Sequence, residues 1–104
     1  GAGLERLASR LRPLLAPDRL VLAYNEFCAP TLEQAVATLV ADGFESIVVV
    51  PSMLTPGGSH SEIDIPEAIE QARGAHPGVS IRYAWPFDLD RIAVMLAEQV
   101  SRQQ

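Results

Sequence analysis

The chain has 104 residues, which is enough for one domain with a single hydrophobic core, and we expect one domain over residues 1–104. Its net charge is −5 and it contains no lysine, which excludes a basic nucleic-acid-binding face, a phosphate-binding P-loop and a Schiff-base lysine. The single Cys28 excludes an internal disulfide and favours a reducing compartment, and apolar runs such as Ile47–Val50 are too short to span a bilayer. We therefore expect a cytoplasmic protein that binds neither nucleic acid nor membrane.

The N-terminal part of the chain has the pattern of a helix followed by a strand. The helix is predicted by leucines at helical spacing, which are Leu4, Leu7, Leu11 and Leu14. Pro17-Asp18 ends this pattern. The apolar stretch Arg19–Tyr24 then predicts the first strand.

The clearest predicted helix begins near Thr31, a suitable N-cap, and ends near Asp42-Gly43. Its apolar face consists of Leu32, Ala35, Val36, Leu39 and Val40. The segment Ser46–Val50 follows and is rich in β-branched residues, as is typical of a strand that is buried on both faces. We expect this second strand to lie centrally in a sheet.

The C-terminal half begins with a polar, glycine-bearing segment, Ser52–Ile63, which we expect to be a loop. Pro66 suits the first turn of a third helix, which Gly74–Gly78 ends. Val79–Ala84 predicts the third strand, and Asp88 is a candidate N-cap for a last helix. The apolar face of that helix consists of Leu89, Ile92, Ala93, Leu96 and Val100.

The alternation of helices and strands predicts an α/β fold of three layers, in which a small parallel sheet has helices on both faces and right-handed crossovers. The first helix has no strand before it. We therefore expect that an N-terminal strand of this fold is missing from the sequence.

Ligands of parallel sheets bind in the loops at the C-terminal edge of the strands. Here those loops are Asn25–Cys28, Ser52–Ile63 and Trp85–Asp88. The middle loop has twelve residues (52–63), where such connections usually have about two to six, so we expect the functional site there. The side chains expected to converge are Glu26, His60, Glu62 and Asp64, with Trp85 and Phe87.

His60, Glu62 and Asp64 alternate by two along the chain. In an extended segment all three side chains share one side, whereas in a helix His60 and Asp64 still share a face. Imidazole and carboxylate groups suit a divalent metal ion, as ligands or as acid–base groups. The alternative is that His60 is simply solvated and that the two carboxylates only favour the N-terminus of the helix that follows.

The remaining candidates have structural explanations. His76 lies in a turn at the opposite edge of the sheet, and we assign it no role. Cys28 is expected to be a small loop or core residue. Trp85 and Phe87 are expected either to pack in the core or to face a flat ring at the ligand edge.

Four stretches of the sequence carry a resemblance to a known family. They are Tyr24-Asn-Glu26 followed by Ala-Pro30-Thr-Leu-Glu-Gln-Ala, the strand entry Gly43–Pro51, then Met53-Leu-Thr-Pro-Gly-Gly-Ser-His60-Ser-Glu-Ile-Asp64-Ile-Pro66, and Tyr83-Ala-Trp-Pro86. In these stretches the chain resembles the small sirohydrochlorin chelatases of the CbiX type, which belong to the class II chelatases. The resemblance runs from about Arg19 to Val100, and His60–Pro66 is its most specific part.

This resemblance implies insertion of a divalent metal into the tetrapyrrole sirohydrochlorin, without ATP or an organic cofactor. The metal is cobalt in cobalamin biosynthesis or iron in siroheme biosynthesis, and the short members of the family imply a homodimer. His60 and Glu26 are then the expected catalytic residues, and His60, Glu62 and Asp64 the expected metal ligands. The expected substrate-binding residues are Met53, Leu54, Gly57, Gly58, Ser59, Trp85 and Phe87.

The family usually begins with a strand that ends in Gly-His-Gly-Ser and supplies a second histidine, and no segment of this sequence matches it. The alternative interpretation is therefore a non-catalytic tetrapyrrole- or metal-binding module that has lost the second site histidine. Because the resemblance implies a substrate rich in carboxylates and the chain is acidic, arginines such as Arg82 are expected to compensate locally.

Overall fold

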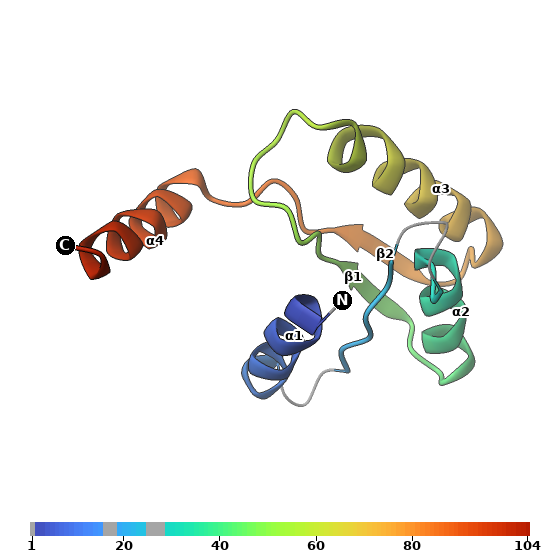
Figure 1. Cartoon of the computed structure of the whole chain (residues 1–104). Helices are drawn as coiled ribbons and strands as arrows, with labels where there is room; N and C mark the ends of the chain where they lie inside the picture. Colours follow the sequence, from blue (N-terminus) through green and yellow to red (C-terminus); the bar gives the residue numbers. More distant parts are fainter. Residues whose placement is uncertain (1, 16–18, 25–28) are drawn as a thin grey trace.

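The computed structural model describes residues 2–15, 19–24 and 29–104. Its elements in chain order are α1 (Ala2–Leu15), α2 (Leu32–Ala41), β1 (Ser46–Val49), the π-helical turn η1 (His60–Asp64), α3 (Ile65–Ala75), β2 (Ser80–Tyr83) and α4 (Leu89–Arg102). Figure 1 shows the two strands between pairs of helices. The α/β class and the small parallel sheet expected from the sequence are confirmed.

The sheet has two strands in the described ranges. β1 and β2 run parallel, with Ser46 opposite Ser80 and Val49 opposite Tyr83. The expected strand Arg19–Tyr24 is not formed, because only Tyr24 makes an isolated bridge, in which its N–H donates to the carbonyl of Pro30 at 2.8 Å. The prediction of a strand at Arg19–Tyr24 was therefore wrong: an apolar run indicates partial burial, but a strand also needs a backbone neighbour about 4.8 Å away.

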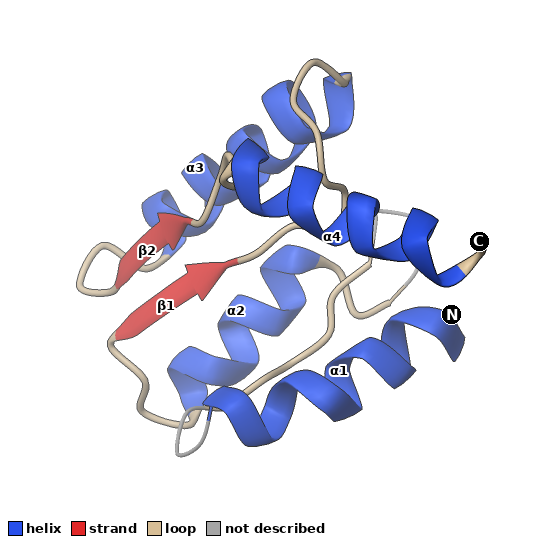
Figure 2. Ribbon diagram, turned by 90° about the vertical axis from the view of Figure 1, so that its left-hand side faces the viewer, coloured by secondary structure: helices blue, strands red, loops and turns tan. Residues whose placement is uncertain are grey.

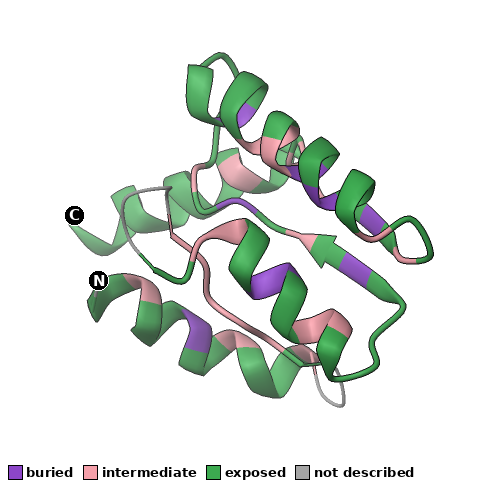
Figure 3. Ribbon diagram, turned by 90° about the vertical axis from the view of Figure 1, so that its right-hand side faces the viewer, coloured by how far each residue is buried: buried purple, intermediate pink, exposed green. Residues whose placement is uncertain are grey.

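The hydrophobic core lies on one face of the sheet, beneath α2 and α3. It consists of Val36, Ile47, Ile69, Ala72 and Ile81, all between 2% and 7% exposed. The paired residues Ile47 and Ile81 supply the sheet side of this core, and Figure 3 shows the buried positions of α2, α3 and β1 facing inward. The apolar faces of α2 and α3 therefore pack against the sheet, as their periodicity predicts.

The opposite face of the sheet is much more exposed. Figures 1 and 2 show α1 and α4 on this side, so the order of layers is helix, sheet, helix. However, Val48 and Val50 are 50% and 57% exposed, and no residue along the fully described α4 is buried. The segment Ser46–Val50 is thus covered on one face only, and the expectation that it is buried on both faces was wrong.

Two predicted helix caps are present. The side chain of Thr31 accepts the N–H of Gln34 at 3.2 Å, and the side chain of Gln34 accepts the N–H of Thr31 at 2.9 Å, which is a capping box. Asp88 accepts the N–H of Asp90 at 2.9 Å and begins α4. These local bonds fix where α2 and α4 start.

One side chain covers the outer edge of β2. The Nε and Nη2 atoms of Arg73 on α3 donate to the carbonyl oxygen of Ile81 at 3.0 and 2.7 Å. Ser80 donates its N–H to Glu45, just before β1, and Ala84 donates its N–H to Val49, so the alternation of the strand directs the intervening Ile81 carbonyl away from β1.

None of the helices in the described ranges has the length and apolar character needed to cross a membrane.

Candidate functional site

The π-helical turn η1 follows the long connection that leaves β1. The loop predicted to reach Ile63 is shorter than expected, because helical structure begins already at His60. The N–H of Ile65 donates to the carbonyl of His60, five residues earlier, which defines the π-type winding. Such turns occur frequently at functional sites, and this one lies at the end of the sheet where ligands of parallel sheets bind.

The turn is anchored to the end of β2 through Ser61. Ser61 is 1% exposed, and its hydroxyl donates to the carbonyl of Gly58 at 3.1 Å. The carbonyl of Ser61 accepts the Tyr83 hydroxyl at 3.0 Å. Burial, and to a smaller degree the nearby carboxylate of Glu62, raise the pKa of Tyr83 above its usual 10.0, so the phenol stays protonated and keeps donating at neutral pH.

His60 and Asp64 come together on one face of this turn. The distance from His60 Nδ1 to Asp64 Oδ2 is 3.5 Å, and the two side chains are 54% and 60% exposed. This is the helical alternative considered from the sequence, in which residues four apart share a face. A carboxylate at Nδ1 orients the ring and directs Nε2 as the nitrogen that can meet a metal ion or a proton.

Glu62 points elsewhere. Its Oε1 accepts the indole N–H of Trp85 at 3.0 Å and the N–H of Gly57 at 3.4 Å. Residues two apart on a helix point in nearly opposite directions, so the Glu62 side chain lies on the opposite face from His60 and Asp64. Over the ranges that the structure describes, no three His, Cys, Asp or Glu side chains are grouped to hold a metal ion. The expected set of three metal ligands is therefore not assembled.

Three aromatic side chains continue from the end of β2, and we call Tyr83, Trp85 and Phe87 the aromatic ladder. The rings of Tyr83 and Trp85 stack, with centroids 6.2 Å apart and an interplanar angle of 19°. Trp85 and Phe87 meet edge to face, with centroids 5.5 Å apart. These arrangements are favourable for aromatic rings, and all three side chains are half-buried.

A shallow hollow joins two of the predicted substrate-contact residues to α4. Leu54 and Phe87 line it together with Asp88, Arg91, Ile92 and Met95. The α4 residues were not predicted as part of the site, because helical periodicity assigns apolar side chains such as Ile92 to a core and not to a surface. Arg91 is also the arginine nearest to this hollow, whereas Arg82, named from the sequence, donates to Ser46 in the neighbouring strand at 3.4 Å.

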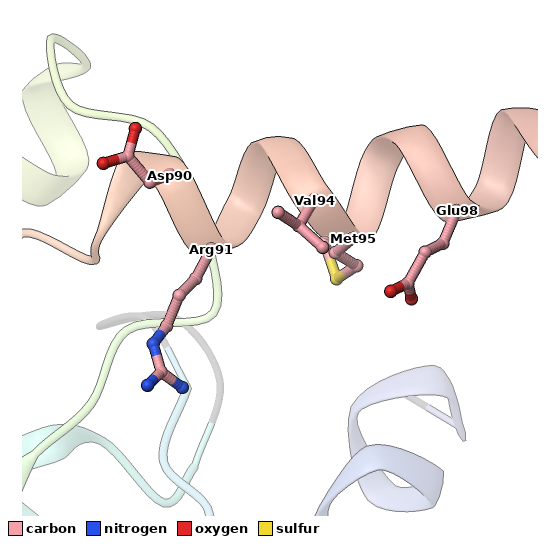
Figure 4. Close-up of a pocket in the computed structure, with 5 residues that line it drawn as sticks. All are labelled: Asp90, Arg91, Val94, Met95 and Glu98. Carbon is pink, nitrogen blue, oxygen red and sulfur yellow. The ribbon is translucent and has the colours of Figure 1, made fainter.

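A second hollow runs along α4 itself. Figure 4 shows its lining, which consists of Asp90, Arg91, Val94, Met95 and Glu98. All five residues come from one helix, and none was predicted as part of the site. This hollow is therefore separate from the turn that carries His60.

The other expected residues differ in what the structure says of them. Glu26 lies outside the described residues, as does the rest of the segment 25–28 that contains Cys28. Met53 is half-buried, and Gly57 has a φ of 109°, a conformation that favours glycine. His76 follows the end of α3, whereas His60 precedes its start, so the two histidines lie at opposite ends of this helix.

Gly58 and Ser59 complete the expected substrate-binding set. Both are exposed and directly precede His60. The carbonyl of Gly58 accepts the N–H of Glu62 at 3.1 Å, so these residues form the entry into η1.

Comparison with known proteins places the chain in a family. The CbiX family model matches residues 2–103. The sirohydrochlorin cobaltochelatase of Priestia megaterium is 41% identical over 71 residues, which are 68% of this chain and 23% of that protein. The protein of the same name from Sulfurisphaera tokodaii is 36% identical over 84 residues, which are 80% of this chain and 66% of that protein. The chain thus spans less than two thirds of either relative.

A solved structure agrees with this assignment over almost the whole chain. It is a CbiX protein of cobalamin (vitamin B12) biosynthesis from Marinobacter aquaeolei VT8, and it superposes with a TM-score of 0.75 at 27% identity. The match covers 99% of this chain and 86% of the solved one. Family model, relatives and fold agree with the resemblance seen in the motif around His60, and the chain belongs to the CbiX family.

Proposed function

We propose that this chain carries out insertion of a divalent metal ion into sirohydrochlorin, as a lyase-type chelatase that needs no ATP. The observation that carries the proposal is the His60–Asp64 pair, which lies on a π-helical turn after β1. Cobalt is the first metal to test, because both curated relatives are named sirohydrochlorin cobaltochelatases. Iron, the metal of siroheme, is the second.

The chemistry requires proton acceptors and a transient metal ligand. When a divalent ion enters the macrocycle, two pyrrole nitrogens lose their protons while the ion loses water. His60 Nε2 either accepts one of these protons or holds the ion during transfer, while Asp64 fixes the ring through Nδ1. Glu26 is proposed as a further site carboxylate.

The flat substrate needs an apolar wall beside this pair. We assign that wall to Met53, Leu54, Trp85 and Phe87, with the backbone of Gly57, Gly58 and Ser59 at its edge. Arg91, which lies beside Leu54 and Phe87 and 3.9 Å from Asp88, supplies a cation for substrate carboxylates.

We further propose that the protein works as a homodimer in the cytoplasm. The helix α4 presents an exposed apolar surface, which we call the α4 face: Leu89, Leu96 and Val100, which share one side of the helix and are each 53% to 59% exposed. Apolar surface of this kind is typical of a contact between proteins. The single cysteine of the chain favours a reducing compartment.

The proposal is tested by following cobalt insertion into sirohydrochlorin by visible absorbance, anaerobically, against a control without protein. The native-length protein should exceed the control, and His60→Ala should fall to it. The matched control variant is His76→Ala, since it replaces the other histidine of the chain and should retain the wild-type rate. A wild type no faster than the control would refute metal insertion, and the same assay with ferrous iron tests metal choice.

One observation favours a second candidate, a non-catalytic tetrapyrrole- or metal-binding module. The described part of the chain assembles one histidine–carboxylate pair and no larger ligand group. In the same assay this candidate predicts saturable sirohydrochlorin binding without acceleration. Turnover above the spontaneous rate would eliminate it.

A further inference from the structure

The carboxylate of Glu62 joins two segments that are 23 residues apart. Its Oε1 accepts the indole N–H of Trp85 at 3.0 Å and the N–H of Gly57 at 3.4 Å. An indole N–H can only donate, and a carboxylate is the strongest acceptor among the side chains, so this bond orients the ring in one direction. The contact links η1 to the residues that leave β2.

The neighbouring residue makes a second, parallel link. The carbonyl of Ser61 accepts the Tyr83 hydroxyl at 3.0 Å, and Ser61 itself is 1% exposed. The adjacent residues Ser61 and Glu62 thus bind Tyr83, the last residue of β2, and Trp85, two positions later. Residues two apart in an extended chain place their side chains on the same side. The rings of Tyr83 and Trp85 also stack on each other, so the two bound side chains are in contact.

The two links place His60 and the aromatic ladder in a fixed relation. His60 precedes Ser61 and Glu62 directly and lies on the other face of the turn, with Asp64. The Ser61 link rests on backbone and a buried residue, whereas the Glu62 link rests on an exposed side chain that a substitution can remove without opening the core. The Glu62 link can therefore be removed by substitution while the Ser61 link stays in place.

We propose that Glu62 is a positioning residue, which holds the Trp85 ring so that a flat tetrapyrrole bound against the aromatic ladder lies beside His60. This inference rests on the proposed function. Glu62 acts through Trp85 and not as a metal ligand, because it is turned toward the indole and Gly57, away from the face that His60 and Asp64 share. Its removal weakens substrate binding and leaves the metal-handling pair intact.

The test compares Glu62→Ala, Trp85→Phe and the double variant in the sirohydrochlorin assay with the native-length protein. Each single variant should raise KM about tenfold, as the loss of a charge-assisted hydrogen bond predicts, with kcat within about twofold of wild type. The double variant should raise KM no further, because both changes remove the same bond. Glu62→Gln retains an acceptor oxygen and should restore KM to near the wild-type value.

Two further measurements separate this role from the alternatives. Titration with cobalt alone, followed by calorimetry, should give the same affinity for wild type and Glu62→Ala, whereas a weaker affinity would make Glu62 a metal ligand and overturn the proposal. Trp85 is the only tryptophan, so iodide quenching of its fluorescence should increase in Glu62→Ala and not in Glu62→Gln.

The outcomes distinguish the two proposals. Absence of metal insertion by the wild type refutes the proposed function, whatever the fluorescence shows. Normal insertion together with an unchanged KM in Glu62→Ala refutes the role of Glu62 alone. Additive KM effects in the double variant would also refute it, because they would mean that Glu62 and Trp85 act independently.

Discussion

Asp64 Oδ2 lies 3.5 Å from His60 Nδ1, four residues further along the same helical segment. Both side chains are more than half exposed, so solvent screens the pair and its contribution to folding stability is small. Its effect is on orientation, since the carboxylate selects which ring nitrogen faces the site.

Asp64→Asn should therefore lower the rate of cobalt insertion by about tenfold, the size of effect typical when a histidine loses its orienting carboxylate. The thermal midpoint should stay unchanged. Glu67→Gln is the matched control, because Glu67 is an exposed carboxylate in the next helical turn and should have the wild-type rate. Equal rates for Asp64→Asn and wild type would mean that His60 acts without Asp64.

The raised pKa of Tyr83 predicts a loss of stability at alkaline pH. The folded protein holds the phenolic proton more tightly than the unfolded chain, whose tyrosines titrate near the usual 10.0. Stability is therefore unaffected below that pH and falls as pH rises from there through the folded pKa. Glu62→Gln removes one of the two causes and should lower the midpoint of the Tyr83 titration, followed by the ultraviolet absorbance of the phenolate.

Tyr83→Phe identifies which of the two tyrosines is responsible. In that variant the late titration step should disappear, and alkaline unfolding should begin at higher pH. A late step that persists in Tyr83→Phe would contradict the assignment.

Ile69→Ala should destabilise the fold strongly. Ile69 on α3 is 2% exposed, and truncating such a side chain leaves a cavity that costs about 2–5 kcal/mol of the free energy of unfolding. Ile63→Ala, at a position that is 51% exposed, should change it by about 0.5 kcal/mol or less. Urea denaturation compares the two, and equal losses would show that the core is not where the structure places it.

Substitutions on the α4 face should weaken self-association. Leu96 and Val100 are 53% and 59% exposed, and Leu96→Glu with Val100→Glu places two charges on this surface. Sedimentation velocity should give a dimer for wild type and a monomer for the double variant. Glu98→Gln on the same helix is the control and should stay dimeric. A monomeric wild type would refute the homodimer.

The sequence predicted best those features that depend on neighbouring residues. The helix that Thr31 begins and the one that Asp88 begins are present with the expected caps, because capping depends on side chains a few residues from the helix start. The shared face of His60 and Asp64 was likewise one of two local alternatives. The start of helical structure at His60 was missed, since Gly57, Gly58 and Ser59 have the composition of a loop.

Features that depend on distant parts of the chain could not be predicted. The bond between Glu62 and Trp85 joins residues 23 positions apart, and no spacing rule connects them. The strand expected at Arg19–Tyr24 failed for a related reason, because strand formation depends on a backbone partner that lies elsewhere in the sequence. In both cases the residue types were compatible with more than one local structure, and contacts with distant parts of the chain decided which one formed.

Arg73 gives the sheet two unequal edges. Its guanidinium occupies the outward carbonyl of Ile81 and so blocks β2 against a further strand, in the way that charged side chains protect exposed edges. No described strand pairs with the other side of β1, where the backbone groups of Ser46 and Val48 point outward. Growth of this sheet is therefore directional: any strand that joins it, from this polypeptide or from another, adds beside β1 and next to the exposed Val48, on the flank away from Arg73.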